Sequence, residues 1–248
     1  MKKLLPLIIG ASFFSNLASA DTIFGIYAGT GNWKPEFSGS ISNGSTDTID
    51  FGNSGVNIAD EDQSGFYIAV EHPIPFVPNI MITEQDMASS GTGNFTGDFA
   101  GQSFAGSVDT EFDLSFNDTT LYYEVLDNWV NLDLGITART FDGLARVSDS
   151  VNNAIRSEDV LDETVPMLYG KARFDLPFTG LSLSVIVNTL SFGDNGITDT
   201  SAVLGYESSF GLGLEAGVRT FTLDLEDAGN FGSDLEFDGA FVNVTYHF

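Results

Sequence analysis

The chain has 248 residues and a strong excess of acids, with 35 Asp and Glu against nine Lys and Arg and a formal net charge of −26. Because such a field repels phosphates, nucleic-acid binding is excluded. The chain has no cysteine, which excludes the disulfides on which many small exported domains rely.

Residues 1–20 match a secretory signal peptide. Two lysines at positions 2 and 3 precede an apolar run over 4–17, and an Ala-Ser-Ala cleavage site ends at Ala20. The run is shorter than the ~20 residues that a membrane-spanning helix needs. We therefore expect export with cleavage after Ala20. Residues 21–248 then form one domain with seven bases against 35 acids, a net charge of −28.

Beyond the signal, the hydropathy pattern favours strands. No stretch approaches the 18 consecutive apolar residues of a helical span, whereas ten segments alternate apolar and polar side chains and end at turn residues. Successive side chains of a strand point to opposite faces, so one face can meet lipid and the other a lumen. The predicted strands are 22–34, 62–72, 78–87, 117–126, 130–141, 163–175, 181–192, 199–209, 212–225 and 236–248.

The connections distinguish a membrane barrel from a soluble sandwich. Short turns alternate with long polar connections, which is the layout of periplasmic turns and extracellular loops in outer-membrane barrels. The chain is therefore predicted to be an all-β, transmembrane, antiparallel up-and-down β-barrel of ten strands. Eight or twelve strands stay open, because residues 108–116 also alternate and either extend the fourth strand or form a separate element. The predicted long loops are 35–61, 88–116, 142–162, 193–198 and 226–235.

Aromatic residues fall at strand ends and turns, where rings suit the headgroup region of a bilayer. The last strand ends in Tyr246 and Phe248, a C-terminal aromatic pattern that resembles the signal read by the outer-membrane assembly machinery. The residues predicted to form aromatic girdles are Trp33, Phe76, Trp129, Phe178 and Phe210.

Charged residues recur on the face predicted to line the lumen. Six acids and four bases share it, although the mature chain has only seven bases. A charge persists in a low-dielectric interior when it is paired. A ten-stranded barrel is narrow, so a plug of ion pairs is favoured over an open pore. The predicted lumen charge cluster is Glu71, Glu124, Asp133, Arg139, Lys171, Arg173, Asp175, Glu207, Glu215 and Arg219.

Catalytic and metal motifs are weak. The two histidines, His72 and His247, fall at the turn end of the predicted barrel, and no G-x-S-x-G or Cys/His metal spacing occurs. We expect no enzyme activity, no catalytic or metal residue and no cofactor, apart from weak Ca²⁺ or Mg²⁺ at the acidic loops or at lipopolysaccharide. The loop acids are Asp47, Asp50, Asp60, Glu61, Asp62, Asp142, Asp149, Glu158, Asp159, Asp162, Asp194, Asp199, Glu226, Asp227 and Asp234.

Three stretches resemble a family of small, uncharacterised Gram-negative outer-membrane β-barrel proteins of about this length. They are residues 21–29, the central segment 121–135 with its Leu-Tyr-Tyr-Glu-Val-Leu-Asp-Asn-Trp run, and the final aromatic. The resemblance implies the barrel fold and an outer-membrane location, and it brings no catalytic or binding residues.

Two functions follow as hypotheses. The first is a monomeric structural or surface-interaction barrel with a largely ion-plugged lumen, whose partners are outer-membrane lipid, lipopolysaccharide and, during insertion, the assembly machinery. The second is a narrow cation-preferring channel for small solutes. An outer-membrane hydrolase is a less favoured alternative.

Overall fold

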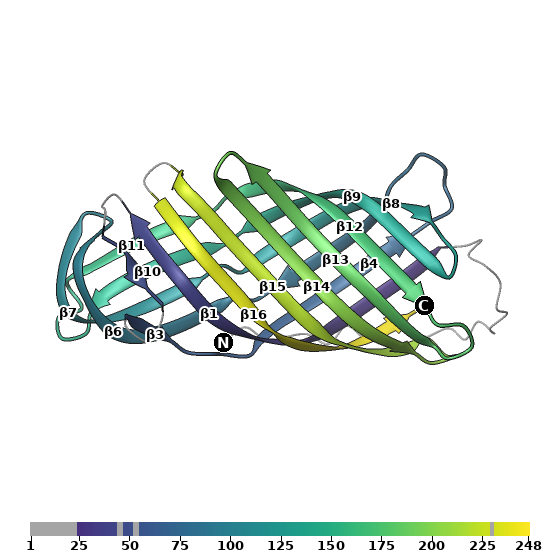
Figure 1. The fold of residues 1–248 in the computed structure, drawn as a ribbon, viewed down its shortest axis with the longest axis horizontal. Helices are drawn as coiled ribbons and strands as arrows, with labels where there is room; N and C mark the ends of the chain where they lie inside the picture. The colour runs from purple at the N-terminus through teal and green to yellow at the C-terminus, as the bar shows by residue number, and fades with distance from the viewer. Residues whose placement is uncertain (1–23, 44–46, 52–54, 229–230) are drawn as a thin grey trace, which may run out of the picture.

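The computed structural model describes residues 24–43, 47–51, 55–228 and 231–248, so the predicted signal peptide over 1–20 lies outside the described residues. Within them, ten antiparallel strands each pair with the next, and β16 pairs with β1 to close a barrel (Figure 1). These strands are β1 (Gly25–Asn43), β4 (Gln63–Glu71), β5 (Asn79–Gln85), β8 (Phe116–Leu126), β9 (Val130–Phe141), β12 (Thr164–Asp175), β13 (Leu181–Phe192), β14 (Asn195–Glu207), β15 (Leu212–Ala228) and β16 (Phe231–His247).

The prediction of a ten-stranded antiparallel barrel is confirmed. All ten predicted segments are barrel strands, and most of their bounds agree within two residues. The differences lie at the end away from the turns, where β1 runs on to Asn43, β14 begins at Asn195 and β16 begins at Phe231. Each of these strands continues past the point where its outer face stops being apolar.

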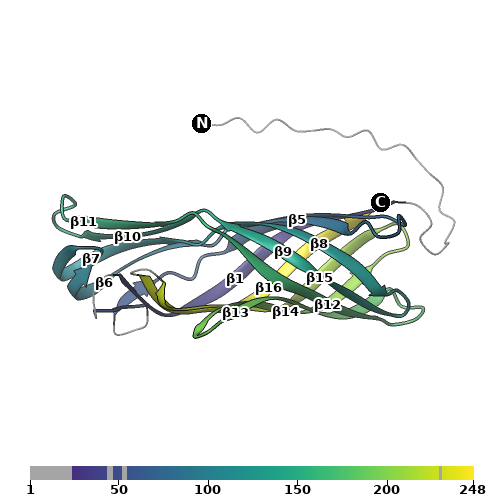
Figure 2. The same cartoon turned by 90° about the horizontal axis from the view of Figure 1, so that it is seen from above.

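Three of the five predicted long connections are confirmed as long, but they carry strands, whereas the other two belong largely to barrel strands. The connection 193–198 is a tight hairpin between β13 and β14, and most of 226–235 belongs to β15 and β16. The other three carry strands that form a second, five-stranded sheet in the order β11-β10-β7-β6-β3. Figure 2 shows β6, β7, β10 and β11 continuing the barrel beyond one end. These strands are β3 (Val56–Ile58), β6 (Ala88–Phe99), β7 (Gln102–Asp113), β10 (Gly143–Asp149) and β11 (Arg156–Leu161), with β2 (Ile49–Asp50) added to β1.

The polarity of the inner and outer faces of the barrel wall reverses along a single strand. This reversal explains the apolar outer band of the turn-end half. It also explains the second sheet and the hairpin-end half of the wall, which together we call the extension. On β15 the outward residues change from Leu212, Leu214 and Val218 to threonines and Asp224, while the inward residues change from Glu215 to Phe221. The turn-end half is therefore apolar outside and polar inside, as a membrane barrel is. The hairpin-end half has a polar outer face and an apolar interior, as a water-soluble sheet has.

An apolar core fills the interior of the hairpin-end half. Phe221 and Phe237 pack ring to ring at 5.6 Å, and Phe112 stacks on Phe237 at 6.2 Å, so barrel wall and second sheet share one core. Burying side chains of this size stabilises by roughly 1.5–3 kcal/mol each. The strands of the extension alternate polar and apolar residues, and their apolar residues face this core. Packing of these inward residues stabilises the extension.

Exposed aromatics crowd the opposite end, at the turns. Phe76 and Phe178 are fully exposed, and both have φ of 66° in a Pro-Phe turn closed by an i to i+3 hydrogen bond. A left-handed backbone is costly for a residue with a Cβ, so these rings are held outward against local strain. Trp129 and Phe210 are also exposed there. Trp33 contradicts the predicted girdle: it points inward and is 2% exposed, because its strand continues well beyond it.

Within the described residues there is no helix with the length and hydropathy to span a bilayer.

Candidate functional site: the barrel lumen

The lumen of the turn-end half encloses a cavity of about 710 Å³. Its lining includes residues of the turns, Asp127 and Pro177 among them, and His247 near the C-terminus, so its mouth lies at the turn end. All ten residues of the predicted charge cluster line this cavity: Glu71, Glu124, Asp133, Arg139, Lys171, Arg173, Asp175, Glu207, Glu215 and Arg219.

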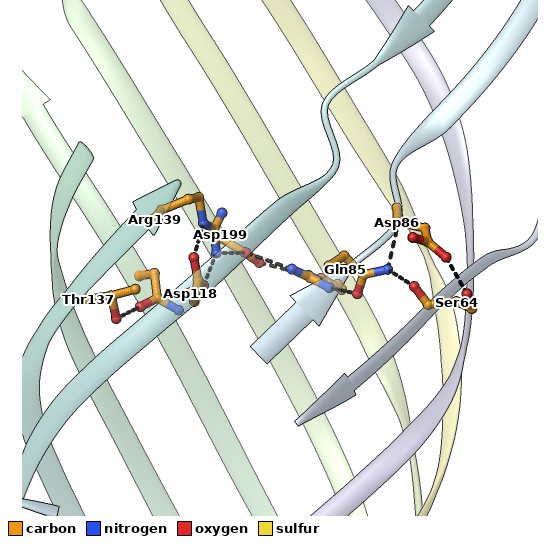
Figure 3. A network of polar contacts seen from close by, with 9 residues as sticks. Ser64, Gln85, Asp86, Asp118, Thr137, Arg139 and Asp199 are labelled. Atoms are coloured by element: carbon orange, nitrogen blue, oxygen red, sulfur yellow. Dashed lines mark hydrogen bonds and ion pairs between the residues drawn. The ribbon is translucent and has the colours of Figure 1, made fainter. Parts of the chain in front are cut away.

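A layer of ion pairs crosses the lumen at the deep end of this cavity (Figure 3). Arg139 donates from Nε and Nη2 to the two carboxylate oxygens of Asp118 at 2.8 and 2.7 Å, and from Nη2 to Asp199 at 2.8 Å. Arg219 donates to both oxygens of Asp199 at 2.8 and 2.7 Å and to Gln85 at 2.6 Å. This ion layer, formed by these five residues, ties β5, β8, β9, β14 and β15 together across the barrel.

Aromatic rings cover the two guanidinium groups of the ion layer. Arg139 Cζ lies 3.6 Å from the centre of the Phe116 ring, and Arg219 Cζ lies 4.8 Å from that of Trp33. Such cation–π contacts are worth about 2 kcal/mol when desolvated. Arg139 is 1% exposed, and its Nη1 is buried without a hydrogen-bond partner in the described chain. The layer is therefore a desolvated boundary between the cavity and the apolar core.

The cavity ends at this boundary. Beyond it the interior positions are taken by Phe116, Phe141, Phe221, Phe237 and Leu235, each at most 2% exposed. The sequence-based interpretation of a lumen plugged mainly by ion pairs is therefore corrected. Ion pairs form one layer, apolar side chains fill the hairpin-end half, and the turn-end half keeps an open cavity.

On the turn side of the layer, the bases of the cavity each have an acidic partner. Lys171 Nζ lies 3.7 Å from Asp133, and Arg173 Nε lies 2.8 Å from Asp175. His247 lies 3.3 Å from Glu207 and stacks on Tyr27, with ring centres 4.0 Å apart. The acids outnumber these bases, so the cavity has a negative field.

The sequence-based prediction missed three residues of the ion layer: Asp118, Asp199 and Gln85. Asp118 has the same parity on β8 as Glu124 and could have been assigned to the lumen on that ground. Asp199 was placed among the loop acids, but it lies within β14, points inward and contacts both arginines. Gln85 had no charge to mark it. The predicted strands ended too early because their ends were set where the outer face stops being apolar.

The outer face of the extension holds many of the remaining acids. There Arg146 pairs with Glu111 and, at 2.9 Å, with Glu158, and these partners raise the pKa of Arg146 above its ordinary value, chiefly through the hydrogen bond to Glu158. In the described chain, no group of three or more His, Asp or Glu side chains is arranged to hold a metal ion. The acids of the described residues are thus spread over the surface and do not form a compact metal-binding group.

Comparisons with known proteins leave the family open. No family model and no curated protein matches the chain, so the family resemblance noted above is not assigned. Among solved structures, the chain resembles Ail, the attachment invasion locus protein of Yersinia pestis (9% identity, 92% of this chain and 100% of that chain, TM-score 0.35). It also resembles the outer membrane protein AlkL (13%, 96% and 96%, TM-score 0.38) and the CymD monoaromatic hydrocarbon channel (7%, 92% and 89%, TM-score 0.33).

At these identities and scores, no functional residue or role is carried over from these proteins. The closed barrel and its outward apolar band are those of an outer-membrane β-barrel.

Proposed function

We propose that this protein is a closed outer-membrane barrel that holds a rigid, acidic β-structure outside the cell as an interaction surface. The observation that supports this proposal is the closure of the interior: the ion layer and the apolar core occupy the lumen where a pore would have to pass. The short turns and the C-terminus face the periplasm in this arrangement, and the second sheet faces outward.

The extension has the properties of such a surface. Its strands are paired and packed on a core, and its outer face carries Glu36, Asp109, Glu111, Glu236 and Asp238, all exposed. The surface would meet lipopolysaccharide through bridging divalent cations, or a partner with basic patches. The protein acts as a monomer and needs no cofactor in this proposal, and insertion uses the assembly machinery acting on Tyr246 and Phe248.

A narrow cation-preferring channel is the second candidate, and the negative cavity favours it. Conduction would require the ion layer and the core above it to separate. Such a movement breaks contacts of Arg139 and Arg219 at 2.6–2.8 Å and opens an apolar core.

Planar-bilayer recording separates the two candidates. The proposal predicts no discrete conductance steps from the purified barrel at any voltage. Steps whose size changes in Glu215→Gln or Asp133→Asn would establish a conducting lumen and overturn the proposal. Glu36→Gln, on the outer face of β1, is the matched control because it removes one charge outside the cavity.

A further inference from the structure

The cavity contains an acidic cluster that the ion pairs do not neutralise. Glu71 on β4, Glu124 on β8 and Asp133 on β9 all line it. Glu124 and Asp133 are direct cross-strand neighbours, a placement in which like charges repel. Lys171 contacts Asp133 at 3.7 Å, whereas Glu71 and Glu124 have no salt bridge with any described residue.

Neutral groups hold these two carboxylates in place. The Tyr122 hydroxyl donates to Glu71 at 2.8 Å, and Glu124 accepts from the side chain of Asn79. These hydrogen bonds fix the position of the charges without compensating them. A charge kept in a cavity without a counter-ion is costly, which makes a bound cation favourable there.

Tyr169 supplies the second observation. Its side chain is buried, with the residue 5% exposed, and it lines the cavity from β12. Its hydroxyl lies within electrostatic range of Asp133 and Glu71, and the described residues form no hydrogen bond with it. Because this hydroxyl lines the cavity without a partner from the described chain, it is available to a ligand. Its ring meets that of Tyr122 at 5.7 Å, and Gly135 lies between the two in register.

The arrangement of the acids and the size of the cavity indicate which class of cation it can bind. The acids are not arranged as a compact metal site in the described chain, and the cavity of about 710 Å³ is within the range of small-molecule sites. Tyrosine faces attract ammonium groups. A second carboxylate, Glu215, lines the cavity from β15, and its described hydrogen bond comes from Asn243, which is neutral. An extended ligand with several ammonium groups can meet both acidic points.

We propose that this cavity is a binding site for an aliphatic polyamine, entered from the turn end, in which Glu71, Glu124 and Asp133 hold ammonium groups and the Tyr169 hydroxyl accepts a hydrogen bond from one of them. The site uses only the turn-end half of the barrel, so it does not depend on whether the lumen conducts.

Calorimetric titration of the folded barrel in detergent, with spermidine as the probe, tests the site. We expect one saturable site, weaker binding of the diamine putrescine, and no competition by Mg²⁺ at equal charge concentration. Glu71→Gln and Glu124→Gln should each weaken spermidine binding by at least about tenfold, the loss expected for one charge-assisted hydrogen bond. Tyr169→Phe should weaken it several-fold while retaining the ring.

The controls are Glu36→Gln and Tyr206→Phe, which make the same chemical changes on outward-facing positions of β1 and β14. Heat-modifiable migration on a gel confirms that each variant is folded. The proposal is overturned if spermidine gives no saturable heat, if Mg²⁺ displaces it as well as putrescine does, or if the controls weaken binding as much as the cavity variants.

Discussion

Arg139 connects the cavity to the core, and its replacement is the sharpest test of the ion layer. Arg139→Met removes three charge-assisted hydrogen bonds and the contact with Phe116 at 3.6 Å. Asp118 then stays buried without a cation, whereas Asp199 keeps Arg219. Removing one partner of a buried pair costs about 3–5 kcal/mol, so we expect a loss of this size in the free energy of unfolding.

The assay is reversible urea unfolding of the barrel in lipid vesicles, followed by tryptophan fluorescence. Arg146→Met is the matched control, since Arg146 also bridges two acids but lies on the outer face of the extension, where water screens the pairs. The double variant Arg139→Met with Asp118→Leu should recover part of the loss, because it removes the orphaned carboxylate. Equal losses for Arg139→Met and Arg146→Met, or no recovery in the double variant, would refute the reasoning.

Two further predictions concern the core and the terminal strand. Phe221→Ala, in the core of the extension, should lower the free energy of unfolding by about 3–5 kcal/mol in the same assay, whereas Thr222→Ala beside it should change it little; equal effects would contradict a packed interior. Deleting Phe248, whose amide donates to Ile26 at 2.9 Å, should reduce outer-membrane insertion and leave periplasmic aggregate. Normal heat-modifiable barrel in the membrane fraction would count against that role.

The sequence predicted the barrel well where one face of a strand meets lipid. On β15 the alternation of Leu212, Leu214 and Val218 fixed the phase, and that phase placed Glu215 and Arg219 inside. Four of the seven Lys and Arg residues beyond residue 20 could be assigned to the lumen in this way. Such assignments need only the period of two and one apolar face.

The extension could not be predicted by the same rule, because its faces are reversed. Phe104, Val108 and Phe112 on β7 are inward core residues, but they alternate with polar residues in a Gly- and Ser-rich context that is typical of loops. The ring partners of Phe112 are Phe51, just after β2, and Phe237 on β16, and both are far away in sequence. A search for alternation of either polarity would have found these strands, and it would also have placed Asp118 and Asp199 in the lumen.

The cavity itself depends on three-dimensional facts that one sequence does not contain. Tyr122 and Tyr169 come from different strands, and their contact across Gly135 is a matter of register. The position of the ion layer, where the cavity ends, likewise depends on the register of four barrel strands. That register brings Asp118, Arg139, Asp199 and Arg219 to one level.

Thiol labelling tests the central claim, a cavity that opens only at the turn end. The chain has no cysteine, so a single one can be introduced at Ser201 in the cavity or at Asp238 on the outer face of the extension. With a membrane-impermeant maleimide on intact cells, we expect Asp238→Cys to react and Ser201→Cys to stay unmodified until the periplasm is opened. Equal labelling of Ser201→Cys before and after opening would contradict the closed interior.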